Sequence, residues 1–266
     1  MTKPEFIPTV KEVESILLPK IKPSGGPLFF ATSLKEARGH VLDSGSFGLV
    51  DTGKKKLLVT CHHVWNDFLK QRAKHSKCKL CVCLDERSPV VFSEFADGTK
   101  IEPIDQNKEL DIATFDMSPF LSACKGRRFF KLDTGVGGQL KEQDAVAIIG
   151  YPGKFRTELE EGISFGNVPH IGFASSISGY FFVMDFTRMM SINRELDMHH
   201  KSEKHQYGGI SGGPCFMFGR DYEPVLVGIV SDNLKFSFGE LDIIKITSTS
   251  CIDEDGKLRP AASAYE

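Results

Sequence analysis

The sequence predicts an all-β fold, either a barrel or a sandwich. Its apolar segments are short and rich in Val, Ile and Phe, and 25 Gly and 13 Pro residues that favour turns are scattered between them. These segments do not alternate with long helical patterns, which disfavours a parallel βαβ sheet. The chain has neither a repeat of fixed period nor a low-complexity tract.

Strands are predicted wherever an apolar segment is bounded by turn residues. These segments are Phe47–Val50, Lys56–Thr60, Lys79–Leu84, Val90–Glu94, Ile112–Asp116, Ala145–Gly150, Phe181–Phe186, Pro214–Phe218 and Val225–Ser231. Helical patterns are confined to Val10–Leu18, to Val64–Ala73 and to a short segment near the C-terminus. The polar stretch from Arg188 to Gln206 is predicted to be an insertion between strands.

Composition places the chain among ordinary globular proteins. Its 266 residues are 41% hydrophobic and 26% charged, and the formal net charge is −2. The chain therefore lacks the net positive charge that is typical of nucleic-acid-binding proteins. No apolar run approaches the roughly 20 residues that span a bilayer. We therefore expect neither nucleic acid nor a membrane as a partner.

The N-terminus and the cysteines indicate a cytoplasmic protein. The segment from Met1 to Lys20 has acidic residues and prolines where a signal peptide has a basic and an apolar region. Seven cysteines, an odd number in a chain long enough to fold without disulfides, are typical of free thiols in a reducing compartment. The set at positions 75, 78, 81 and 83 (His, Cys, Cys, Cys) has zinc-like spacing but no second pair of ligands, and a strand explains it better, so no metal is expected.

Three short segments carry the residue types that acyl transfer needs. They are 60–64 (TCHHV) at the end of one apolar strand, 110–115 (LDIATF) at the start of another, and the glycine-rich turn 208–214 (GGISGGP). Each segment alone is a routine surface feature. Together they provide a hydroxyl nucleophile, an imidazole base and a carboxylate that orients the imidazole. A tetrahedral intermediate also needs two N–H donors, for which the turn offers Gly209 and Ser211.

The order His, Asp, Ser, with the patterns T-x-x-H-V, D-I-A and G-x-S-G-G-P, resembles the chymotrypsin/trypsin-like serine protease family. The sequence is most similar to the bacterial Deg-type and glutamyl-endopeptidase branches. Segments 45–50 (GSFGLV) and 147–153 (AIIGYPG) resemble parts of the first and second barrels of that family. The likeness extends from Gly45 to Ile246, which is most of the chain.

The resemblance implies two antiparallel six-stranded barrels with the active site in the cleft between them, plus short N- and C-terminal helical segments. The implied regions are an N-terminal extension (1–27), a barrel carrying the His and Asp (28–133), a barrel carrying the Ser and the S1 pocket (134–250), and a C-terminal tail (251–266).

The resemblance assigns Ser211 as the nucleophile, His63 as the base and Asp111 as the carboxylate that orients it. The T-x-x-H-V register selects His63 over His62, and strand alternation turns His62 toward the opposite face. Asp116 lies at the far end of its strand, where the family does not place the orienting acid, and we interpret it as a solvated carboxylate. Removal of either partner of the nucleophile is expected to reduce turnover by orders of magnitude.

The S1 pocket is atypical by the same analogy. The resemblance places four residues there: His205 at the floor, Ser231, Asn233 at a rim position where the family usually has glycine, and Gly239. A histidine below a narrowed entrance predicts a small, polar or acidic P1 residue. A cleavage profile with Arg or Leu at P1 would contradict this expectation.

Ile210 stands where the digestive members of the family carry an Asp that pairs with a newly cut N-terminus, so this form of activation is absent. The oxyanion turn is then either always formed or ordered by a partner that acts on the insertion at 188–206. Because the insertion runs directly into the turn, we expect the second. Activity that stays constant after residues 188–204 are shortened would contradict this.

The function predicted from the sequence is that of a cytoplasmic, bacterial serine endopeptidase with narrow specificity or conditional activation. Its substrate is a protein or peptide, a protein partner activates or inhibits it, and it requires no cofactor. The alternatives are a catalytically silent module that acts as a binding or regulatory protein, and an enzyme of the same fold that acts on small acyl groups.

Overall fold

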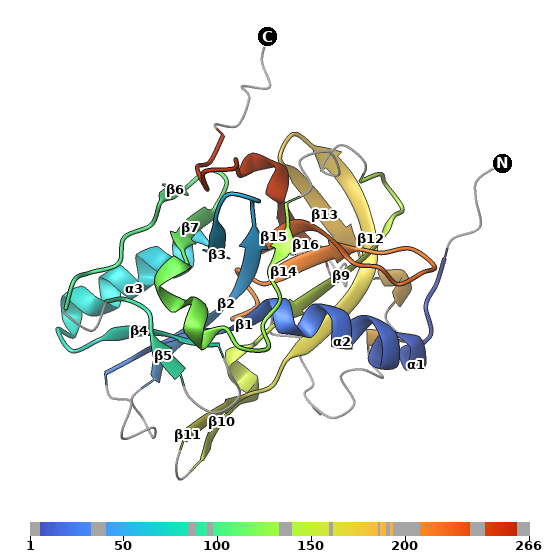
Figure 1. Cartoon of the computed structure of the whole chain (residues 1–266). Coiled ribbons are helices and arrows are strands. Elements are labelled where there is room, and N and C mark those ends of the chain that lie inside the picture. The colour runs from blue at the N-terminus through green and yellow to red at the C-terminus, as the bar shows by residue number, and fades with distance from the viewer. Residues whose placement is uncertain are drawn as a thin grey trace.

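The computed structural model describes residues 6–32, 41–84, 89–94, 98–132, 140–159, 162–185, 187–189, 192–193, 208–234 and 243–259. Most of the predicted insertion at 188–206 lies outside these residues. Strands dominate the described part, as predicted, and they form two halves that lie side by side (Figure 1). None of the helices described is both long enough and apolar enough to cross a membrane.

The C-terminal half is a closed barrel of six antiparallel strands in the order β12-β13-β16-β15-β14-β9. The strands are β9 (Ala145–Gly150), β12 (Val168–Ser178), β13 (Phe181–Asp185), β14 (Pro214–Met217), β15 (Val225–Leu234) and β16 (Ile243–Ser248). Side chains that alternate along the strands fill the interior, among them Val146, Ile148, Phe182, Met184, Val227 and Ile246. One of the two predicted six-stranded barrels is therefore confirmed.

The N-terminal half is an eight-stranded sheet in the order β5-β4-β1-β2-β3-β7-β6, with β8 added parallel to β2. The strands are β1 (Gly25–Ala31), β2 (Val41–Asp51), β3 (Lys56–Thr60), β4 (Lys79–Cys83), β5 (Pro89–Val91), β6 (Asp105–Asn107), β7 (Ile112–Asp116) and β8 (Phe130–Lys131). In the described residues it does not close into the six-stranded barrel that we expected. In the described part of the chain the ladder ends at β5 and β6, which have three residues each.

Helix α3 (His62–Lys74) covers the N-terminal sheet. It begins directly after β3, slightly earlier than the helix predicted over Val64–Ala73. The ring of Trp65 lies 5.0 Å from that of Phe115 in β7, and the ring of Phe68 lies 5.7 Å from that of Phe30 in β1. These contacts fix the start of the helix, with its two histidines, against the sheet.

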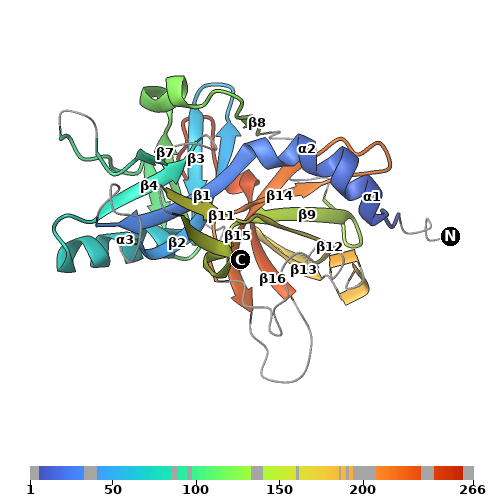
Figure 2. The same cartoon turned by 90° about the horizontal axis from the view of Figure 1, so that it is seen from below.

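The N-terminal residues 6–24 pack on the outside of the C-terminal barrel, as Figures 1 and 2 show. Thr9 and Glu12 form a capping box, and helical turns then continue to Ser24. Three side chains at four-residue spacing, those of Val13, Leu17 and Ile21, are fully buried in the core. Strand β1 begins at Gly25, within the residues expected to form an extension.

The remaining elements are short. They are α1 (Val10–Glu12), the π-helix η1 (Val13–Leu17), α2 (Leu18–Ile21), the 3₁₀-helices η2 (Lys22–Ser24), η3 (Ser118–Ala123), η5 (Gly153–Phe155), η6 (Thr187–Met189) and η7 (Thr249–Cys251), and the hairpin of β10 (Arg156–Leu159) and β11 (Gly162–Phe165). Helical turns near both ends of the chain agree with the prediction.

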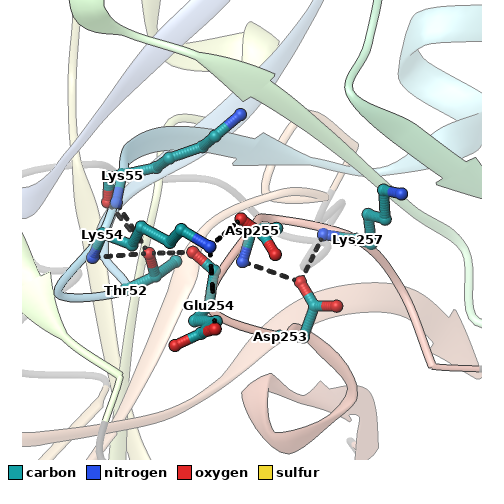
Figure 3. Close-up of polar contacts among 7 residues, drawn as sticks. All are labelled: Thr52, Lys54, Lys55, Asp253, Glu254, Asp255 and Lys257. Atoms are coloured by element: carbon teal, nitrogen blue, oxygen red, sulfur yellow. Dashed lines mark hydrogen bonds and ion pairs between the residues drawn. The ribbon is translucent and has the colours of Figure 1, made fainter.

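The C-terminal residues 253–258 pack on the N-terminal half, as Figure 3 shows for the β2–β3 turn. Thr52 Oγ1 donates a hydrogen bond of 2.6 Å to the carbonyl of Glu254, and Lys54 Nζ lies 2.6 Å from the Asp255 carboxylate. The hydrogen bond between these two charged groups raises the pKa of Lys54 and lowers the pKa of Asp255.

Substitution of Leu17 tests the docking of the N-terminal segment. Leu17→Ala is expected to lower the free energy of unfolding by about 2–5 kcal/mol, because it removes a fully buried side chain and leaves a cavity. The neighbouring Ile16 is 38% exposed, and Ile16→Ala should cost less than about 1 kcal/mol. Urea unfolding followed by circular dichroism measures both, and equal losses would contradict this packing.

Candidate active site

His63 and Asp111 form a hydrogen-bonded pair where α3 begins. Asp111 Oδ2 lies 2.7 Å from Nδ1 of His63, and Oδ1 accepts a hydrogen bond of 2.9 Å from the His63 main-chain N–H. That N–H belongs to the first turn of a helix, where amides lack helical partners and the helix dipole favours a carboxylate. With Nδ1–H donated to Asp111, Nε2 is the proton acceptor of the neutral imidazole.

The carboxylate is aimed by an unusual backbone conformation. Asp111 has a φ of +53°, in the left-handed region that residues other than glycine rarely adopt. The preceding residue, Leu110, is held on both sides: its N–H donates to Asn107 Oδ1 at 2.9 Å, and its carbonyl accepts from Thr247 Oγ1 at 2.8 Å. Because Thr247 lies on β16, both halves of the molecule enforce the position of Asp111.

Ser211 lies in a turn that glycine makes feasible. Gly209 and Gly212 have φ values of +97° and +92°, and a Cβ on Gly212 would lie 2.1 Å from a neighbouring carbonyl oxygen. Between them, Ile210 is buried in the barrel interior. Gly150 makes room for it, since a Cβ there would lie 2.5 Å from that of Ile210. A buried apolar side chain therefore anchors the turn.

One carbonyl group joins this turn to the histidine segment. The carbonyl oxygen of Val230 in β15 accepts a hydrogen bond of 2.8 Å from the N–H of Gly212 and lies 3.0 Å from Cys61 Sγ. Gly212 follows Ser211 directly, and Cys61 is the N-cap residue of α3, two residues before His63. The segments that carry the three predicted catalytic residues thus meet in one place.

The main-chain N–H groups of Gly209 and Ser211 have fixed orientations. The carbonyl of Gly208 accepts a hydrogen bond of 3.1 Å from the N–H of Gly153, and the carbonyl of Ile210 accepts one of 2.9 Å from an N–H later in the turn. In a trans peptide the N–H points away from the carbonyl, so these bonds also orient the two N–H groups. Neither N–H donates to another group within the described residues. Two oriented donors that have no acceptor among the described residues suit a negatively charged oxygen.

The predicted pocket is described in part. Ser231 and Asn233 lie on β15, where Ser231 is fully buried and its Oγ donates to the carbonyl of Lys245 at 3.2 Å. This hydroxyl is therefore engaged with the barrel wall. His205 and Gly239 lie outside the described residues.

The rival residues lie apart from this arrangement. Asp116 is at the opposite end of β7 from Asp111 and accepts a hydrogen bond of 2.8 Å from the N–H of Ser118. The Nδ1 atom of His62 is buried and has no hydrogen-bond partner among the described residues. Neither residue contributes to the contacts that join His63, Asp111 and the Ser211 turn.

A metal would fit this site poorly. Cys61, His63 and Asp111 place ligand atoms within 4.8 Å of one another. Two ligands of a tetrahedral zinc ion are about 3.3 Å apart, whereas His63 Nδ1 and Asp111 Oδ2 are separated by 2.7 Å, a hydrogen-bond distance. Among the described residues, the set at positions 75, 78, 81 and 83 does not bring three ligand atoms within 4.8 Å of one another.

The cysteines are free thiols, of which six are buried and Cys83 is half-buried. All seven lie in the described residues, and none is in a disulfide. Burial raises the pKa of the Cys81 thiol to about 12, so this group stays protonated at neutral pH.

Ser46 belongs to the site, although sequence reasoning did not assign it a role. It lies on β2, and its Oγ donates to the carbonyl of Gly209 at 2.7 Å while its N–H donates to the carbonyl of Ser211 at 2.9 Å. The only local signal is a G-S-x-G pattern at 45–48. Its partner Gly209 is 163 residues away along the chain, so the contact could not be found from the pattern alone.

Substitution of Gly212 tests the close packing of the turn. Gly212→Ala is expected to cost more than about 3 kcal/mol of stability, because the new Cβ meets a carbonyl oxygen at 2.1 Å in addition to the strain of a positive φ. Gly53 also has a positive φ, but a Cβ added there would meet nothing within 4 Å, so Gly53→Ala should cost only about 1–2 kcal/mol. Thermal unfolding compares the two, and equal losses would contradict the packing.

The comparisons with known proteins find similarity at the level of fold. No family model matches the chain, and no curated protein matches it. The solved serine endoprotease from Yersinia pestis matches with a TM-score of 0.51 and 14% identity, covering 92% of this chain and 64% of that one. An HtrA-type protease with a decapeptide matches at 0.46 and 13%, covering 88% of this chain and 62% of that one. A thermostable serine protease from an extremophilic microorganism matches at 0.45 and 12%, with coverage of 85% and 91%.

The chain thus spans less than two thirds of the length of the Yersinia pestis protein. At 14% identity the likeness establishes a shared fold, and 92% of this chain takes part in it. The chain therefore shares its fold with that serine endoprotease, as the resemblance of its motifs implied.

Proposed function

We propose that the chain is a serine endopeptidase that cleaves proteins or peptides through an acyl-enzyme intermediate. One observation carries this proposal: the hydrogen-bonded pair of His63 and Asp111 lies beside the turn of Ser211, and that turn offers two oriented main-chain N–H groups. The arrangement has a nucleophile, a base, an orienting acid and an oxyanion site, which are the four parts that acyl transfer requires.

In the first step, Ser211 Oγ attacks the scissile carbonyl carbon while its proton passes to Nε2 of His63. The Asp111 carboxylate stabilises the imidazolium through the bond to Nδ1. The carbonyl oxygen becomes negatively charged and accepts hydrogen bonds from the N–H groups of Gly209 and Ser211. His63 then protonates the leaving amine, the C–N bond breaks, and the acyl group remains as an ester on Ser211.

In the second step, water replaces the amine. His63 Nε2 takes a proton from the water, whose oxygen attacks the ester through a second tetrahedral intermediate. The proton returns to Ser211 Oγ as the C–O bond breaks and the acid is released. The side chain of His63 is 45% exposed, which supports access by substrate and water.

The activity is controlled by narrow substrate specificity rather than by an activating partner. Two features support a turn that forms without help: Ile210 is buried in the barrel, and the carbonyls of Gly208 and Gly209 are both hydrogen-bonded. In the cytoplasm, damage to other proteins would then be limited by the choice of substrate. The proposed P1 residue is small, polar or acidic, as inferred from His205 and Asn233.

Labelling with a fluorophosphonate tests the nucleophile. The wild-type chain is expected to gain one adduct on Ser211, located by intact mass and peptide mapping, and Ser211→Ala should gain none. Labelled wild type that also cleaves a protein substrate would exclude an enzyme for small acyl groups. A folded wild type that is never labelled would contradict the proposal in favour of a catalytically silent binding module.

Substitution of the two candidate acids tests the orienting role. Asp111→Asn is expected to lower kcat by about 10³–10⁴-fold, because an amide at this position favours the wrong imidazole tautomer. Asp116→Asn removes a carboxylate from the other end of the same strand and should leave kcat within about twofold. Steady-state hydrolysis of a protein substrate measures both, and similar losses would refute the assignment.

A further inference from the structure

Ser46 lies at the junction between the two halves, and all of its hydrogen-bonding groups have partners there. Its side chain is fully buried, and its Oγ accepts from the N–H of Tyr151 at 2.9 Å and donates to the carbonyl of Gly209 at 2.7 Å. Its N–H donates to the carbonyl of Ser211 at 2.9 Å, and its carbonyl accepts from Thr60 Oγ1 at 2.8 Å. One residue of the N-terminal half therefore contacts the nucleophile turn, the end of β9 and the end of β3.

The position of the hydroxyl hydrogen follows from these contacts. Because the N–H of Tyr151 points at Oγ, the hydrogen of Ser46 is directed to the carbonyl of Gly209, and the two bonds strengthen each other. The carbonyl of Gly208 is bound by Gly153 at 3.1 Å. The peptide groups on both sides of the Gly209 Cα atom are thus fixed, which leaves the Gly209 N–H a single direction.

The turn needs such a restraint because of its composition. Four of the six residues from Gly208 to Gly213 are glycine, the residue with the largest conformational freedom in the unfolded chain. Gly209 has access to conformations at negative φ in which its N–H points elsewhere. Buried Ile210 fixes the centre of the turn, and Gly153 holds the carbonyl of the peptide that precedes Gly209. The hydroxyl of Ser46 restrains the peptide that follows Gly209, and this bond helps to hold Gly209 at its positive φ.

We propose that Ser46 is a positioning residue. Its hydroxyl keeps the Gly209 N–H directed at the oxyanion position before substrate arrives. This inference rests on the proposed function and deepens it. Ser46 touches neither the substrate nor the reacting atoms, and its hydroxyl acts through the peptide group between Gly209 and Ile210. The oxyanion site is therefore ready in the free enzyme, with a serine of the opposite half as its support.

The test compares Ser46→Ala with Ser93→Ala. Ser93 is also a fully buried serine of the N-terminal half, and its hydroxyl accepts a main-chain hydrogen bond from Leu80, outside the site. The readout is inactivation by a fluorophosphonate, split into the maximal rate constant and the half-saturating concentration. We expect Ser46→Ala to lower the rate constant by about 10–100-fold, which is less than or equal to the loss of an oxyanion donor itself. The half-saturating concentration should change less than about threefold, and Ser93→Ala should react like wild type.

The pH dependence of inactivation separates this role from an effect on the base. Because Ser46 does not contact His63 or Asp111, Ser46→Ala should keep the wild-type midpoint while its rate falls. A midpoint that moves together with the rate would overturn the proposal, since Ser46 would then act through the imidazole. Equal reactivity of Ser46→Ala and wild type would also overturn it.

Two further comparisons complete the test. If Ser46→Ala does not fold, Ser46→Thr retains the hydroxyl: a rate constant within about fivefold of wild type supports the proposal, and a loss of 100-fold or more in the folded variant overturns it. A folded wild type that does not react at all would overturn the proposed function, and this inference with it. A reactive wild type with an unaffected Ser46→Ala overturns only the inference.

Discussion

The contact between the Ser211 turn and β2 is the interaction on which the site depends. The turn comes from the C-terminal barrel, whereas the imidazole and the carboxylate come from the N-terminal half. Thr60 Oγ1 binds the carbonyl of Ser46, whose N–H in turn binds the carbonyl of Ser211. Catalytic groups have to be held to within about 0.5 Å of their working geometry. Hydrogen bonds between main-chain groups and short side chains can achieve this, because few rotatable bonds separate them from the backbone.

The groups that hold the turn are uncharged. Hydroxyls, peptide groups and the buried side chain of Ile210 do not ionise near neutral pH, so the turn keeps its form across the range in which a histidine titrates. Among the described residues of the site, the groups that can carry charge are His63 and Asp111, which form a hydrogen-bonded pair. In contrast, the exposed pair of Lys54 and Asp255 is screened by solvent and adds little to stability.

Sequence reasoning succeeded where local pattern decides the structure. Strands β3, β7 and β9 have the predicted bounds because each is an apolar run bounded by polar or turn residues. Strand β12 was missed because Pro169, Gly172 and several serines interrupt its apolar pattern, and only its pairing with β9 and β13 makes it a strand. The closed barrel expected in the N-terminal half came from the resemblance, and no local pattern specifies whether the edges of that sheet pair in the described residues.

In the site, too, local pattern separates what the sequence could predict from what it could not. The pairing of His63 with Asp111 could be predicted, since residue types and motif spacing carry it. The roles of Ser46 and Thr247 could not, because their partners lie 163 and 137 residues away along the chain.

Each end of the chain is packed against the half to which it does not belong. The helical residues 6–24 cover the C-terminal barrel, and residues 253–258 bind the N-terminal sheet, where Gly256 accepts a hydrogen bond of 2.6 Å from Thr114. A cut between the halves would therefore strip each of them of a covering segment supplied by the other. Each half thus relies on the other for part of its cover, and a chimera that exchanged one half for that of a protein of the same fold would have to exchange both terminal segments with it.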